Sequence, residues 1–143
     1  MTDNETDEIE KCIESEYHMI FDHNKLAEVV KVVTRNLNKL IDLNYYPVEE
    51  TRISNKSERP IGIGVQGLAD VFYKLGLPYD SEEGIKKAEE VMEFISTEAD
   101  NASMRLAAKR GEFPSWKESV YNKKSKHFRG HHMELRNATR TTL

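Results

Sequence analysis

Residues 80–111 decide the fold class, and they read DSEEGIKKAEEVMEFISTEADNASMRLAAKRG. Apolar side chains recur through this stretch at steps of three and four, which places them on one face of an α-helix: Ile85, Ala88, Met92, Ile95, Ala99, Ala102 and Leu106. Asp80 and Glu83 fit a capping box at its start, and Gly111 is a natural C-terminal stop. The pattern predicts a helix over residues 82–110, about 43 Å long. Such a helix is expected to lie against a larger body than this chain provides.

Two further helical patterns precede the long one. The first is a single apolar stripe, which predicts a helix over residues 23–44: Leu26, Val30, Val33, Leu37 and Leu40. Pro47 is expected to end it. The second runs over residues 66–75, with Gly76 as its left-handed stop. Residues 48–60 carry no period and are predicted to form a loop.

A short extended segment over residues 61–65 reads IGIGV. Gly62, Gly64 and Gly67 match the spacing of a dinucleotide-binding loop, whose glycines let backbone amides approach a pyrophosphate. That motif needs an apolar strand before it, whereas residues 52–59 read RISNKSER, which is typical of a loop. We therefore assign the three glycines to a close-packed strand-to-helix junction. Residues 137–143 are rich in threonine and predict the start of a second strand.

Composition excludes several classes of function. The net charge is −4, and acidic residues crowd the first sixteen positions, so a nucleic-acid partner is not expected. Residues 1–15 are predicted to be an acidic, disordered tail. No apolar stretch is long enough to span a bilayer, so no membrane partner is expected either. The single cysteine, Cys12, cannot form an internal disulfide, which favours a cytoplasmic location.

Few residues suggest chemistry. His127, His131 and His132 could share a metal ion, but no cysteine or well-spaced carboxylate joins them, so a solvated basic loop is the better interpretation. His18 and His23 have no nucleophile paired with them in the sequence. We therefore predict no catalytic, substrate-binding or metal-binding residue in this chain.

Two segments resemble the large, catalytic subunit of ribonucleotide reductases. One reads RNLNKLID at residues 35–42 and NYYPV at residues 44–48. The other reads SNK at residues 54–56 and RPIGIGVQGLAD at residues 59–70. Looser similarity continues through the long helix to LAAKRG and FP, and resumes at RNAT near the end. A chance match of this length is not expected.

The resemblance implies a fold and a reaction. The family's catalytic domain is a ten-stranded α/β barrel, so this chain is expected to be mainly α, a helical fragment of that barrel over residues 16–143 with one or two short strands. The family replaces the ribose 2′-hydroxyl of a nucleoside di- or triphosphate by hydrogen, using a cysteine thiyl radical and a cysteine pair. Those thiols precede the matching segment in the family, and the loop that grips the substrate phosphates follows it.

The resemblance also implies partners that the chain itself does not contain. The parent enzyme would use adenosylcobalamin or a metal-containing radical subunit, together with allosteric nucleotides, and both radical sources stay open. No cofactor is expected to bind this chain. Its partners would be the remaining segments of the large subunit and a radical-generating small subunit.

One cysteine is too few for that chemistry, and the surroundings of Cys12 do not match the family's redox strand. We therefore expect the isolated chain to be inactive. It would be either a separately encoded or intein-interrupted piece, or a truncated remnant. The alternative is a non-enzymatic helical module that uses the same scaffold to bind a protein partner.

Overall fold

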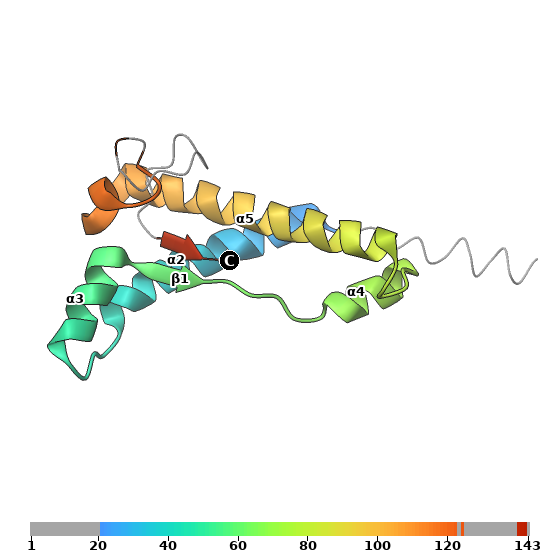
Figure 1. The fold of residues 1–143 in the computed structure, drawn as a ribbon, viewed down its shortest axis with the longest axis horizontal. Coiled ribbons are helices and arrows are strands. Elements are labelled where there is room, and N and C mark those ends of the chain that lie inside the picture. The colour runs from blue at the N-terminus through green and yellow to red at the C-terminus, as the bar shows by residue number, and fades with distance from the viewer. Residues whose placement is uncertain (1–20, 123, 125–139, 143) are drawn as a thin grey trace, which may run out of the picture. The chain divides into compact units, whose positions relative to one another are not determined.

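The structure is a computed structural model, and it describes residues 21–122, 124 and 140–142. The described elements are four α-helices, one short 3₁₀ helix and two short strands (Figure 1). They divide into two compact units. Of the described residues, one unit holds 24–64 together with 92–122, 124 and 140–142, and the other holds 21–23 together with 65–91. The chain is therefore mainly α, as the sequence predicts.

Helix α2 spans His23–Leu43 and belongs to the larger unit except for its first residue. Its buried residues are Val30, Thr34, Asn38 and Ile41. This stripe is rotated from the one predicted from the apolar residues alone, and Leu40 is 54% exposed, so its assignment to the buried face was wrong. The reason is that two polar residues, Thr34 and Asn38, occupy positions on the buried face.

Helix α3 spans Glu49–Glu58, where a loop was expected, so that prediction was wrong. No side chain of this helix is fully buried, which explains why its sequence shows no apolar period. Local contacts support it instead. Asn55 Nδ2 donates to the carbonyl of Thr51 at 2.8 Å, and Glu49 and Arg52 form an ion pair one turn apart. The acidic first turn also suits the positive end of the helix dipole.

The two strands pair in parallel. Strand β1 spans Pro60–Gly62, strand β2 spans Arg140–Thr142, and Ile61 lies opposite Thr141 (Figure 1). Ile61 is buried, with 5% of its surface exposed. Parallel strands require a long crossover connection, and here the intervening chain includes α4 and α5.

Helix α5 spans Glu82–Arg110, within the predicted bounds. The expected capping box is wrong, because the cap is Ser81: its Oγ accepts from the backbone N–H of Gly84 at 3.0 Å. A Cβ on Gly84 would stand 2.8 Å from the carbonyl oxygen of Pro78, so only glycine fits this close turn. Ile85 is 56% exposed and leaves the predicted buried face, whereas Ile95 is 2% exposed and is part of the core.

The segment after α5 closes over an aromatic cluster. Gly111 ends the helix in a left-handed conformation, as predicted. The 3₁₀ helix η1, Pro114–Glu118, then brings the Trp116 ring to 5.7 Å from that of Phe113, edge to face, and both side chains are buried. Trp116 also stacks on Tyr121. Met104 packs against this cluster, which therefore holds the segment after α5 against the helix.

The smaller unit contains α4, Leu68–Leu75, and the first third of α5. Phe72 is buried on α4, and its ring lies 5.6 Å from that of Tyr79. Gly76 ends α4 in the left-handed conformation predicted for it. Within the same unit Glu90 accepts from Lys87 and contacts His23 at 3.0 Å.

Candidate functional site

The most connected polar group in the described residues is the arginine clamp, which we define as Arg59 with its partners Asn38 and Asp42. Arg59 Nη2 donates to both the side-chain and the main-chain oxygen of Asn38, each at 2.8 Å. Nη1 and Nη2 donate to the two carboxylate oxygens of Asp42 at 2.8 and 2.9 Å. A planar guanidinium matches two acceptors at once, which lysine cannot do. The clamp therefore joins α2 to the residue that separates α3 from β1.

Burial makes the clamp more than a surface ion pair. Asn38 is 1% exposed and the Arg59 side chain 14%, while the Asp42 side chain is 48% exposed. Asn38 Oδ1 therefore depends on Arg59 for hydrogen bonds, with Nε a second donor at 3.1 Å. Arg59 holds the pKa of the Asp42 carboxyl below its usual value, chiefly through the side-chain hydrogen bond. The charged clamp is the stable form at neutral pH.

Arg59 also has an unusual backbone. Its φ of 48° and ψ of 51° are left-handed, and its N–H caps α3 by donating to Asn55 at 2.9 Å. A non-glycine residue in this region costs free energy that surrounding contacts must offset. Here the side chain makes those contacts. The same residue thus ends α3 and turns the chain into β1, which begins at Pro60.

The junction glycines lie immediately after the clamp. Gly62 closes β1, and Gly67 precedes α4 with a φ of 80°. Among the described residues, no heavy atom lies within 4 Å of where a Cβ on Gly64 would stand. The positive φ therefore explains why residue 67 is glycine. For Gly64, the described residues include no close neighbour that a side chain would meet.

Several residues considered from sequence lie outside the described residues. Cys12, His18, His127, His131 and His132 are all in this group. Within the described residues, no group of three or more His, Cys, Asp or Glu side chains could hold a metal ion. In the same part of the chain, no helix has the length and apolar character that crossing a membrane requires.

The comparisons with known proteins decide the family. Residues 8–142 match the family model described as "Ribonucleotide reductase, barrel domain". The chain belongs to the ribonucleotide reductase barrel-domain family. It is 52% identical over 103 residues to the ribonucleoside-diphosphate reductase large subunit of Arabidopsis thaliana. The aligned region covers 72% of this chain and 13% of that protein.

Other ribonucleotide reductases give the same result. Identity is 53% over 96 residues with the large subunit of Monkeypox virus, covering 67% of this chain and 12% of the relative. It is 50% over 103 residues with that of Caenorhabditis elegans, covering 72% of the chain and 13% of the relative. The chain thus spans about an eighth of the length of these reductase subunits.

Sequence reasoning missed the clamp, although its members were in view. Asn38 and Asp42 lie in the first segment that resembles ribonucleotide reductases, and Arg59 lies in the second. The available signal was the polar residue at position 38, in step with Val30, Thr34 and Ile41 on a helix. A polar side chain on a buried face requires a partner, but sequence alone does not say which residue supplies it.

Proposed function

We propose that this chain is a scaffold segment in the barrel of a ribonucleoside-diphosphate reductase large subunit and supplies none of its redox thiols. The observation that carries the proposal is the parallel pairing of β1 with β2 on either side of α4 and α5. Strand, helices and parallel strand in that order form the unit from which α/β barrels are built. The relatives are ribonucleoside-diphosphate reductase large subunits, which favours nucleoside diphosphates as the substrates of the parent enzyme.

The chemistry of the family supports a scaffold role. Reduction of a ribonucleotide requires several thiols around one ribose, and this sequence has one cysteine. The electrons and the thiyl radical would therefore come from other segments of the large subunit. A radical source, either a metal-containing small subunit or adenosylcobalamin, would supply the initiating radical. The residues of this chain would hold β1 and β2 in register.

A grafting experiment tests this role. The matching segment of the Arabidopsis thaliana large subunit is replaced by residues 21–142 of this chain, so that both β1 and β2 are included. Deoxyribonucleoside diphosphate formation is then measured with reductant and radical source. We expect the chimaera to retain activity and the isolated 143-residue chain to make no product. Product from the isolated chain would refute the scaffold role. A folded but inactive chimaera would refute the proposed equivalence of the segments.

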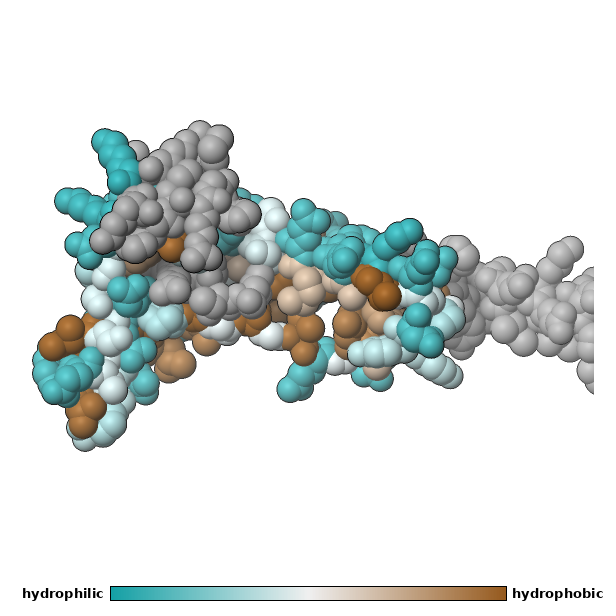
Figure 2. All heavy atoms as spheres, viewed as in Figure 1, coloured by the Kyte–Doolittle hydropathy of each residue, from teal (hydrophilic) through white to brown (hydrophobic). Residues whose placement is uncertain are grey.

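The alternative function is a non-enzymatic helical interaction module. Exposed apolar groups argue for the scaffold role, because a chain with a closed core rarely leaves them in water. Leu43 is 71% exposed and Ile53 56%, and Figure 2 shows hydrophobic surface among the polar side chains of α3 and the turn before it. The module predicts a monodisperse chain by sedimentation. The scaffold predicts self-association that the flanking reductase segments relieve.

A further inference from the structure

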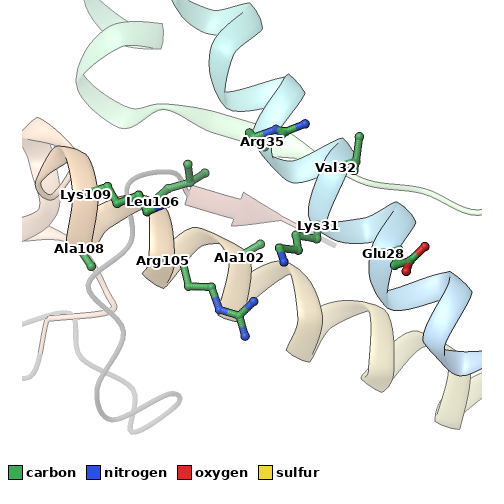
Figure 3. A pocket seen from close by; sticks show the side chains of 9 residues that line it. All are labelled: Glu28, Lys31, Val32, Arg35, Ala102, Arg105, Leu106, Ala108 and Lys109. Atoms are coloured by element: carbon green, nitrogen blue, oxygen red, sulfur yellow. The ribbon is translucent and has the colours of Figure 1, made fainter.

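A groove of about 680 Å³ runs between α2 and the second half of α5, within the larger unit. Its lining comes from matched positions on the two helices. Residues 28, 31, 32 and 35 line it from α2, and residues 102, 105, 106 and 109 line it from α5 (Figure 3). Each set steps by three, one and three, so each is one face of two helical turns.

The two faces carry the same chemistry at the same steps. Lys31 and Arg35 on α2 correspond to Arg105 and Lys109 on α5. All four side chains are exposed, and none has an ion pair with any of the described residues. Among the described lining residues one is acidic, Glu28, and its Oε2 lies 3.5 Å from Nζ of Lys25, which is not one of the four cations. The groove is therefore bordered by four cations that nothing in the described chain neutralises.

The floor of the groove is apolar on its α5 side, where the Ala102 and Leu106 side chains point toward α2 (Figure 3). Lys31 points toward them from α2 (Figure 3). Val32 lies on the side of α2 turned away from α5 and is 44% exposed (Figure 3). Two adjacent helices with such a floor leave a channel suited to a third helix, because neighbouring helix axes lie about 8–10 Å apart.

We propose that this groove is a docking site for an acidic amphipathic helix of a partner polypeptide. On each helix the two cations are four residues apart, about 6 Å along the axis. A partner helix with glutamate or aspartate at positions i and i+4 has the same spacing between its charges as the two cations on each groove helix. Such acidic pairs can flank an apolar stripe on the partner helix. None of the described residues that line the groove is aromatic, so these residues offer a nucleic acid no surface on which to stack its bases.

The site does not depend on the proposed reductase role, and its test uses no activity. The full 143-residue chain is titrated with a synthetic 18-residue helical peptide that carries leucines on one face and glutamates beside them. Binding is followed by fluorescence anisotropy and mapped by backbone amide shifts. We expect the shifts to centre on residues 28–35 and 102–109. The isomer with glutamine in place of glutamate should bind at least about tenfold more weakly at low salt.

Substitutions at exposed positions of the groove are chosen to keep the fold intact. Removing a cation should weaken peptide binding, and removing the acidic residue should strengthen it. The double variant Arg35→Gln with Arg105→Gln should weaken binding about tenfold, and Glu28→Gln should strengthen it about twofold to fivefold. The matched control, Lys74→Gln with Lys86→Gln, removes two exposed cations outside the groove and should leave affinity unchanged.

Three results would overturn the proposal. The first is equal binding of the glutamate and glutamine peptides. The second is equal loss in the groove and control variants, which would indicate attraction by net charge alone. The third is displacement of the bound peptide by heparin or a short DNA duplex as effectively as by unlabelled glutamate peptide, when the competitors are compared at equal concentrations of negative charge. That result would indicate a surface that binds any anion.

Discussion

Replacing Arg59 by alanine tests whether the arginine clamp stabilises the larger unit. The substitution removes both described donors to Asn38 Oδ1, Arg59 Nε and Nη2, and this acceptor belongs to a side chain that is 1% exposed. A buried acceptor left without a partner costs about 1–3 kcal/mol. The contact with the half-exposed Asp42 adds about 0–1 kcal/mol, because water screens it. We expect Arg59→Ala to lower the free energy of unfolding by about 1–4 kcal/mol.

The assay is urea unfolding followed by the fluorescence of Trp116, the only tryptophan, which belongs to the same unit as Arg59. Two comparison variants separate the causes. Arg59→Gly loses the clamp but relieves the left-handed backbone, so it should be more stable than Arg59→Ala by about 1 kcal/mol. Arg59→Lys should fall between wild type and alanine, since an ammonium cannot satisfy both partners.

Arg52→Ala is the matched control, because it removes an arginine–carboxylate pair on exposed α3 and should leave the unfolding midpoint unchanged. The reasoning would be refuted if Arg59→Ala unfolded at the same urea concentration as wild type. It would also be refuted if Arg59→Gly proved less stable than Arg59→Ala, since the backbone would then carry no strain for glycine to relieve.

Further predictions concern single groups in the two units. Because Arg59 lowers the pKa of Asp42 in the folded chain, this carboxylate adds stability above its unfolded pKa of about 3.9 and loses it as pH falls through the lower folded value. Urea unfolding should therefore show that Asp42→Asn is less stable than wild type at pH 7, and the difference in the free energy of unfolding should shrink in acid. A difference that stays constant with pH would contradict this. Thr34 is fully buried and its Oγ1 has no hydrogen-bond partner among the described residues, so Thr34→Val should raise the free energy of unfolding by about 1 kcal/mol, and a loss of stability would show that the hydroxyl is satisfied. Ser81→Ala removes the cap of α5 and should cost about 1 kcal/mol, measured by urea unfolding followed by far-ultraviolet circular dichroism. Gly84→Ala should cost more than an ordinary helix position, since its Cβ meets a carbonyl oxygen at 2.8 Å; a gain in helicity with no loss of stability would exclude that clash.

The sequence by itself determined the elements that depend on local period and helix stops. The long helix, its end at Gly111 and the end of α4 at Gly76 follow from apolar spacing and from glycine's freedom at positive φ. It also determined the family, because two long motifs identify it without any contact being known. Helix α3 could not be predicted this way, since it buries no side chain completely and so leaves no apolar period.

Only the tertiary structure decided what the polar residues of α2 do. Asn38 and Arg59 are twenty-one residues apart in sequence, and their pairing depends on how the chain turns after α3. The same holds for the groove, because Lys31 and Arg105 line one groove only when α2 and α5 lie side by side. Period along a chain reports which face of a helix is apolar. It does not report which distant polar group that face must accommodate, because that partner is chosen by packing.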